Sequence, residues 1–322
     1  DGGGRGATTT FTQRGIGDTL VTFENEASLI EQEVGAGQFD VVILSAKDGK
    51  LIRNLTRGFT TKYDHVSVPL PLGFFIRNLA WSPDGDRLAF FVKKESWQQL
   101  MVYEVLTGRL LQKITFKDIA DCSSPSFSPD GKSVAFSGNR DGYWDIFVYH
   151  FATKSIDNLT QDEYYDTSPT WSADGKTVLY NRRIGAFEKI FTVEVGAPER
   201  KTQLTGGAAS DIAPSFSKDG KWVYFASDRG LYGVFNLHRL DVASGKIDRL
   251  TDLTTGGSVP AEMAKAEDGT TQIAYTCFTG GGFRTYRMKV GGAEVERAMK
   301  VGASEPPSSP LAPSRRAGFR AA

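Results

Sequence analysis

The stretch Ser124-Pro125-Ser126-Phe127-Ser128-Pro129-Asp130-Gly131-Lys132-Ser133-Val134-Ala135-Phe136 decides the fold of this chain. It predicts a strand ending at Phe127, a tight turn, and a returning strand through Phe136. Proline presets the turn, aspartate can bond the turn amides, and glycine accepts the positive φ that a hairpin needs. Two further strands, the second closing on Leu159-Thr160, complete a four-stranded antiparallel unit from Cys122 to Thr160.

This unit recurs along the chain. The aspartate of its Asp-Gly turn returns after 46, 44, 45 and 49 residues, and an aromatic residue before each of the first four turns is followed nine residues later by another. We expect these aromatic pairs to be cross-strand partners. The turn aspartates are Asp84, Asp130, Asp174, Asp219 and Asp268. The fourth strands end in Leu55-Thr56, Ile114-Thr115, Leu159-Thr160, Leu204-Thr205 and Leu250-Thr251.

Repeats of this length, each unable to bury its own apolar faces, predict an all-β fold: a six-bladed β-propeller of four-stranded antiparallel blades around a channel. The core is expected between blades. Residues 1–7 are interpreted as a flexible lead, 57–72 as an insertion between blades, and 301–322 as an extended tail rich in proline, serine and arginine. The expected blades are 8–56, 74–115, 119–160, 164–205, 209–251 and 257–299.

The composition narrows the classes of function. The 38 basic and 38 acidic residues cancel, which gives no electrostatic argument for binding nucleic acid. Cys122 and Cys277 have no partner at metal-ligand spacing, so no zinc or redox site is expected. No apolar run approaches the length of a transmembrane helix. The start at Asp1, without a methionine, indicates a processed chain or a segment of a longer one.

The unit Pro125 to Lys132, echoed at Ala80 to Asp86, Pro169 to Lys176 and Pro214 to Lys221, resembles the repeat of the TolB-type, WD-like bacterial β-propellers. The resemblance covers about Leu20 to Met299. It implies the propeller fold and a location outside the cytoplasm, as in the periplasm. The same repeats also occur in propellers that gate prolyl oligopeptidase-type hydrolases and in oligogalacturonate lyases, so the fold alone does not select a function.

Acidic side chains recur just before the inner strands, at what would be one mouth of the channel: Asp121, Asp166 and Asp211, with Tyr164 and Tyr165 beside the second. One interpretation is a ring that receives a basic peptide terminus, a cation or a polar loop of a partner. The other, the more common use of such residues, is that each aspartate bonds amides of its own loop. Rim tyrosines favour a protein interface.

Departures from the repeat are further candidates for partner binding. The insertion carries Tyr63, Asp64 and His65, and the tail carries Arg315 and Arg316. A surface loop and an extended segment of this kind can both lie along another protein.

Catalytic, cofactor and metal sites are not expected. The turn aspartates belong to their hairpins, and Asp40, Asp145 and Asn236, in one register at the start of the third strand, are expected to bond the adjacent loop. The histidines His65, His150 and His238 occupy three different registers, which disfavours a metal site. Neither a Gly-x-Ser-x-Gly elbow, an HExxH motif nor a P-loop is present.

The sequence therefore favours a non-enzymatic protein-binding or scaffold propeller in a bacterial cell-envelope or membrane-associated complex, with other protein subunits as partners. The alternative is an accessory, gating propeller of a larger hydrolase, or an oligogalacturonate-lyase-like enzyme. A catalytic domain encoded beyond this chain would favour the first alternative, and a divalent metal near His150 or His238 would favour the second.

Overall fold

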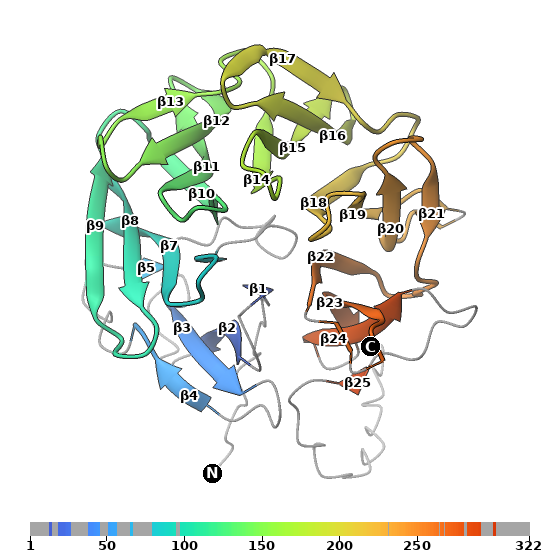
Figure 1. Ribbon diagram of the computed structural model, residues 1–322, viewed down its shortest axis with the longest axis horizontal. Coiled ribbons are helices and arrows are strands. Elements are labelled where there is room, and N and C mark those ends of the chain that lie inside the picture. The colour runs from blue at the N-terminus through green and yellow to red at the C-terminus, as the bar shows by residue number, and fades with distance from the viewer. Residues whose placement is uncertain are drawn as a thin grey trace, which may run out of the picture.

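Strands and turns make up the described part of the chain, which contains no helix. The computed structural model describes residues 13–14, 19–26, 38–45, 51–56, 65–66, 79–94, 97–230, 232–263, 265–266, 268–279, 282–290 and 299–300. Their sheets follow one another around a ring in chain order, and in each four-stranded sheet the first strand lies nearest the centre and the last toward the periphery (Figure 1).

Five sheets are four-stranded antiparallel blades whose strands pair in chain order. The first comprises β1 (Gln13–Arg14), β2 (Thr19–Glu26), β3 (Gln38–Ser45) and β4 (Leu51–Asn54). The next two are β10 (Asp121–Phe127), β11 (Ser133–Arg140), β12 (Tyr143–His150) and β13 (Ile156–Asn158), then β14 (Asp166–Trp171), β15 (Thr177–Ile184), β16 (Phe187–Glu194) and β17 (Ala197–Gln203). The last two are β18 (Asp211–Phe216), β19 (Trp222–Ser227), β20 (Asn236–Asp241) and β21 (Ile247–Arg249), then β22 (Gly257–Glu262), β23 (Thr271–Thr279), β24 (Gly282–Val290) and β25 (Met299–Lys300).

The remaining sheet has five strands, so the prediction of six four-stranded blades is wrong: five have that form. Its strands are β5 (His65–Val66), β6 (Leu79–Trp81), β7 (Arg87–Lys94), β8 (Trp97–Glu104) and β9 (Leu110–Phe116). Both β5 and β6 pair with β7, His65 opposite Lys93 and Leu79 opposite Phe90. The inner strand β6 has only three residues, and the predicted insertion supplies β5 to cover the rest of that edge.

The nine-residue spacing of aromatic residues that repeats along the chain does not reflect the direct cross-strand pairing that was expected. Phe127 pairs with Val134, not with Phe136, and Trp171 likewise pairs with Val178. The predicted nine-residue pairing is therefore wrong by two positions. Since side chains two apart share a face of a strand, Phe136 still lies on the same face as Val134, where it is fully buried.

The core lies between neighbouring sheets, as predicted. Phe91 and Phe116 of one sheet meet Phe136 and Tyr149 of the next, with ring centroids 5.0 to 5.8 Å apart. Similar clusters join each later pair of neighbouring sheets. A single blade would leave one such face in water, so the sheets depend on one another for stability.

The repeated polar residues are explained by hydrogen bonds within each blade. The Ser128 hydroxyl donates to Asp130 (2.6 Å), whose carboxylate accepts the Lys132 amide (3.0 Å). The Thr160 hydroxyl accepts the Ile146 amide of the third strand (3.0 Å), which is why the fourth strand ends in threonine. Equivalent bonds occur in the neighbouring repeats, which agrees with the structural role expected for the turn aspartates.

Each of four inner strands contains a β-bulge that the sequence did not indicate. The residue before proline takes a positive φ of 53 to 59°, a conformation that costs free energy for a side chain other than glycine. The amide of Ser168 is satisfied by the Ser137 hydroxyl of the preceding sheet (3.0 Å), and that of Ala213 by Asn181 (3.0 Å). These bonds join consecutive blades. The bulged residues are Ser124, Ser168, Ala213 and Val259.

Candidate functional site

Four exposed aromatic side chains lie at one end of the ring. Trp97, Tyr143, Tyr164 and Tyr232 are 42, 47, 49 and 88% exposed, and we call the surface they define the aromatic face. They lie in, or directly beside, the connections at the end of the sheets where the inner strands begin. At the opposite end, which we call the turn face, the large exposed apolar residues are aliphatic, and Leu106 and Val242 are two of them.

The predicted acidic residues begin the inner strands, as expected, but two of them are closed off by internal ion pairs. Asp166 has no exposed surface and receives two bonds from Arg182 of the adjacent strand, at 2.8 and 2.7 Å. Burial raises the pKa of Asp166 to about 6, although the guanidinium opposes that rise, so the carboxylate is ionised at neutral pH. The same guanidinium also contacts Asp162 at 2.6 Å.

Asp211 and Asp121 also have side-chain partners within the protein. Asp211, also without exposed surface, accepts two bonds from Arg229 (2.7 and 2.8 Å), and the Lys189 amine lies 3.7 Å away. Asp121 accepts a bond from the Gln98 amide (2.8 Å), and burial raises its pKa. The geometry favours a structural role for these three residues over an open acidic ring. The expected bond to an amide of its own loop is present for Asp121, which accepts the Cys122 amide (3.0 Å), whereas Asp166 and Asp211 are held by arginines.

The two tyrosines lie differently. Tyr164 is half exposed, with the Arg182 guanidinium 4.5 Å from its ring centroid. Tyr165 packs against Trp144 at 5.5 Å, and burial raises its pKa. Only Tyr164 therefore offers a large surface to a partner.

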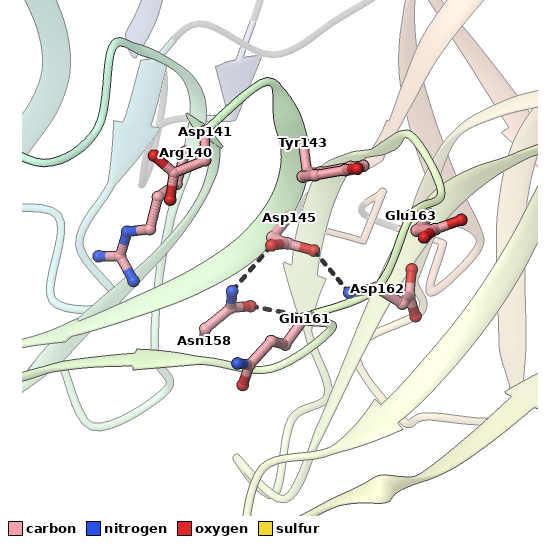
Figure 2. Close-up of a pocket in the computed structure, with 8 residues that line it drawn as sticks. All are labelled: Arg140, Asp141, Tyr143, Asp145, Asn158, Gln161, Asp162 and Glu163. Carbon is pink, nitrogen blue, oxygen red and sulfur yellow. Dashed lines mark hydrogen bonds between the residues drawn. The ribbon is translucent and has the colours of Figure 1, made fainter.

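A polar pocket of about 400 Å³ opens on the aromatic face between the β11–β12 turn and the β13–β14 connection. Figure 2 shows the carboxylates of Asp145, Asp162 and Glu163 gathered below the Tyr143 ring. Asp145 accepts bonds from Asn158 (2.8 Å) and Thr160 (3.0 Å), as expected for a residue that orders the adjacent loop. The pocket is lined by Arg140, Asp141, Tyr143, Asp145, Asn158, Gln161, Asp162 and Glu163.

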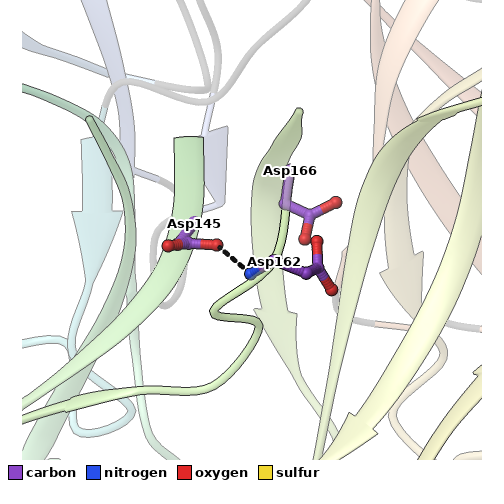
Figure 3. Close-up of side chains that lie close together, drawn as sticks. All are labelled: Asp145, Asp162 and Asp166. Carbon is purple, nitrogen blue, oxygen red and sulfur yellow. Dashed lines mark hydrogen bonds between the residues drawn. The ribbon is translucent and has the colours of Figure 1, made fainter. Parts of the chain in front are cut away.

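Three carboxylates approach one another at this place, within 4.8 Å: Asp145, Asp162 and Asp166 (Figure 3). Such a group could hold a cation, but two of the three already have cationic partners. Arg182 bridges Asp162 and Asp166, and Lys201 lies 3.1 Å from Asp162. A divalent ion would have to compete with both side chains, so the donor set does not fit a metal centre.

The comparison with known families agrees with this architecture. Residues 76–198 match the family model described as TolB beta propeller domain. The repeats within residues 76–198 are of the TolB type. The family resemblance is thus confirmed for the central repeats.

Among the relatives of this chain is the Tol-Pal system protein TolB of Francisella tularensis subsp. mediasiatica, 23% identical over 54% of the chain and 40% of that protein. The uncharacterized peptidase YuxL of Bacillus subtilis is 24% identical over 46% of the chain and 29% of that protein. The chain thus spans well under half the length of these two relatives. The crystal structure of TolB from Acinetobacter baumannii has a TM-score of 0.65 at 20% identity, covering 85% of this chain and 62% of that one, which supports the fold alone.

The remaining predicted contact residues of the TolB-type propeller are only partly described. Tyr63, Asp64, Arg315 and Arg316 lie outside the described residues, and of His65 the backbone is described, in β5. None of the described residues belongs to a helix long and apolar enough to cross a bilayer.

The two histidines with described side chains lie apart and have other partners. His150 Nε2 lies 2.9 Å from the Asp157 carboxylate beside the turn face. His238 is buried, its Nδ1 2.9 Å from the Asn236 carbonyl, and burial lowers its pKa. They share no ligand position, so their arrangement gives no support to a lyase metal site.

Sequence analysis did not identify the cationic side chains that pair with the acidic residues of the site. Arg182 and Lys201 reach the acidic residues from other strands, and only the cross-strand register places them there. The aromatic face had a detectable signal: Trp97 and Tyr143 each directly follow the connection between the second and third strands of a sheet.

Glu188 is a half-buried acid at the same end of the propeller. Its Oε2 atom has no hydrogen-bond partner among the described residues. Burial raises the pKa of Glu188 to about 7, the Arg183 guanidinium opposing and the Asp166 carboxylate adding to the rise. The native state therefore holds a proton where the unfolded chain has lost it, and stability falls as pH rises from about 4.5 to 7.

Glu188→Gln should remove this loss. We expect the variant to be more stable than the parent by about 1 to 3 kcal/mol above pH 7 and equally stable near pH 4. Urea unfolding at a series of pH values measures the difference. Glu199→Gln, at an exposed position of β17, is the control and should change neither limit. A stabilisation independent of pH would contradict the titration of Glu188.

Proposed function

We propose that this chain is a non-enzymatic protein-binding propeller, a scaffold subunit of a bacterial cell-envelope or membrane-associated assembly outside the cytoplasm. In this proposal the five-stranded sheet β5–β9 takes the place of a sixth blade. The observation that carries the function is the aromatic face, because exposed tyrosine and tryptophan are enriched where proteins meet. The name of the Francisella relative, which places that protein in the Tol-Pal system, supports an envelope setting.

The internal pairing of the acidic residues supports a role without catalysis. A general acid or base must reach the substrate, and Asp166 and Asp211 are buried against arginines. The insertion with Tyr63, Asp64 and His65, and the tail with Arg315 and Arg316, are additional contacts in this proposal. The second candidate is an accessory propeller of a hydrolase, and the match to the uncharacterized peptidase YuxL favours it.

Photo-crosslinking tests which end of the propeller binds. A photoreactive phenylalanine replaces Tyr143 or Tyr232 on the aromatic face and, as matched controls, Leu106 or Val242 on the turn face, each in the bacterium that makes the protein. We expect defined protein adducts at the first two positions and not at the controls. Adducts only at the turn face would refute the assignment of the binding end. If all four positions lack adducts, the scaffold proposal itself loses its support.

A further inference from the structure

Asp145 carries a buried negative charge without a counter-ion. The residue is 4% exposed, and its bonds come from the Asn158 amide, the Thr160 hydroxyl and the Asp162 amide at 3.4 Å. None of its partners among the described residues is cationic, in contrast to Asp166 and Asp211. Since buried charges are ordinarily paired, this carboxylate differs from Asp166 and Asp211 at the same end of the ring.

The charge is not needed for the structural task at this position. In the sheet β18–β21 the equivalent residue is Asn236, whose neutral Oδ1 accepts a bond from the Thr251 hydroxyl (2.9 Å) and from the Leu253 amide (2.7 Å). Asp145 makes the same two kinds of bond, also to residues 15 and 17 positions onward. An asparagine at this position would keep these two bonds and lose only the bond from the Asn158 amide (2.8 Å), so the charge itself is not what orders the loop.

Asp145 lines the pocket of the aromatic face, whose other charged walls are mostly acidic. Asp141, Asp162 and Glu163 are the further carboxylates. The one cationic lining residue, Arg140, is engaged elsewhere: its guanidinium lies 4.7 Å from the Phe147 ring centroid, and Figure 2 shows it directed away from Asp145. The half-exposed ring of Tyr143 stands beside the opening. The pocket thus offers negative charge and an aromatic surface together.

We propose that this pocket receives a lysine or arginine side chain from the partner protein, with Asp145 as its counter-ion and the Tyr143 ring against its alkyl stem. A cationic side chain matches both the charge and the aromatic lip. This proposal rests on the protein-binding function and names the chemistry of the segment that docks. A metal ion fits less well because Arg182 and Lys201 already compensate the neighbouring carboxylates.

The test uses fluorescein-labelled hexapeptide pools that differ in one fixed central residue: lysine, arginine, norleucine or glutamate. Binding to the whole chain is followed by fluorescence anisotropy at 0.15 M salt. We expect the lysine and arginine pools to bind about tenfold more tightly than the norleucine pool. Asp145→Asn, which copies Asn236, should fold and should lose this preference. Asp86→Asn, at an exposed position on the turn face, removes the same charge and should retain it.

Two further variants guard against a folding defect in Asp145→Asn. Glu163→Gln and Tyr143→Ala alter exposed positions of the pocket, and each should weaken the lysine pool more than the norleucine pool. Equal binding of all pools, or a lysine preference that survives in Asp145→Asn, would overturn the proposal. So would calcium chloride alone binding to the parent chain but not to Asp145→Asn, because that identifies a metal site. Crosslinks on the aromatic face without any lysine preference would refute the pocket assignment and leave the protein-binding function standing.

Discussion

Arg182→Met is expected to destabilise the propeller by about 3 to 5 kcal/mol. The guanidinium is 7% exposed and joins Asp162 and Asp166, so its removal leaves the fully buried Asp166 carboxylate without a counter-ion. The cost of an uncompensated buried charge exceeds what the original pair contributes, because the desolvation penalty of Asp166 is no longer offset. The midpoint of urea unfolding at pH 7 measures the loss.

Two variants separate this effect from a general cost of losing arginine. Arg200→Met removes an exposed guanidinium paired with Glu194 at 3.1 Å, and its effect should stay within about 0.5 kcal/mol. Adding Asp166→Asn to Arg182→Met should recover part of the stability, since the unpaired charge disappears. A loss below about 1 kcal/mol for Arg182→Met alone would mean that Asp166 is not held as an ion pair.

Asn181→Ala is the second large effect, expected at about 2 to 4 kcal/mol. The buried amide donates to the Asp211 carbonyl (2.6 Å) and accepts the amide of Ala213 (3.0 Å), both in the inner strand of the next sheet. Alanine removes both of these bonds, and with them the support of a bulge with positive φ at Ala213. Thermal and urea unfolding measure the change.

The comparison variant is Ser137→Ala at the equivalent position of the preceding sheet. Its hydroxyl accepts one amide, that of Ser168, so the loss should be about half as large. Asn181→Asp keeps the acceptor and loses the donor, and should fall at least as low as alanine because it also buries a charge. If Ser137→Ala and Asn181→Ala cost the same, the second bond of Asn181 contributes nothing measurable.

The repeated residues predicted most of the fold because each of them makes the same hydrogen bond within its own blade. The Ser-x-Asp-Gly turns and the closing threonines are explained by contacts within one blade, which spacing alone can indicate. The inner-strand bulges and the five-stranded sheet were not predictable in this way. Asn181 supports a residue 32 positions away in another sheet, and β5 fits the edge that the short β6 leaves open.

The candidate site was likewise predictable where it depends on local sequence, and not where it depends on contacts between distant residues. The sequence placed Asp121, Asp166 and Asp211 at the start of inner strands, and the structure puts them there. It could not find their partners, because Arg182 and Arg229 lie 16 and 18 residues from the aspartates they bind, a distance set by hairpin length and register. Nor could it show that Asp145, equivalent to a neutral asparagine, faces a pocket.

The way the ring closes has a mechanical consequence. Each of the described sheets is built from one continuous stretch of chain, and the first and last sheets exchange no strand. Within the described residues, β1 and β22 meet by contact alone, without a ladder of hydrogen bonds. The described sheets therefore form a ring that is closed by contact between its first and last sheets. We expect a force that pulls β1 and β22 apart to separate the first and last sheets before it breaks the hydrogen bonds within any described sheet. The ring could then open and close again while its sheets stay folded.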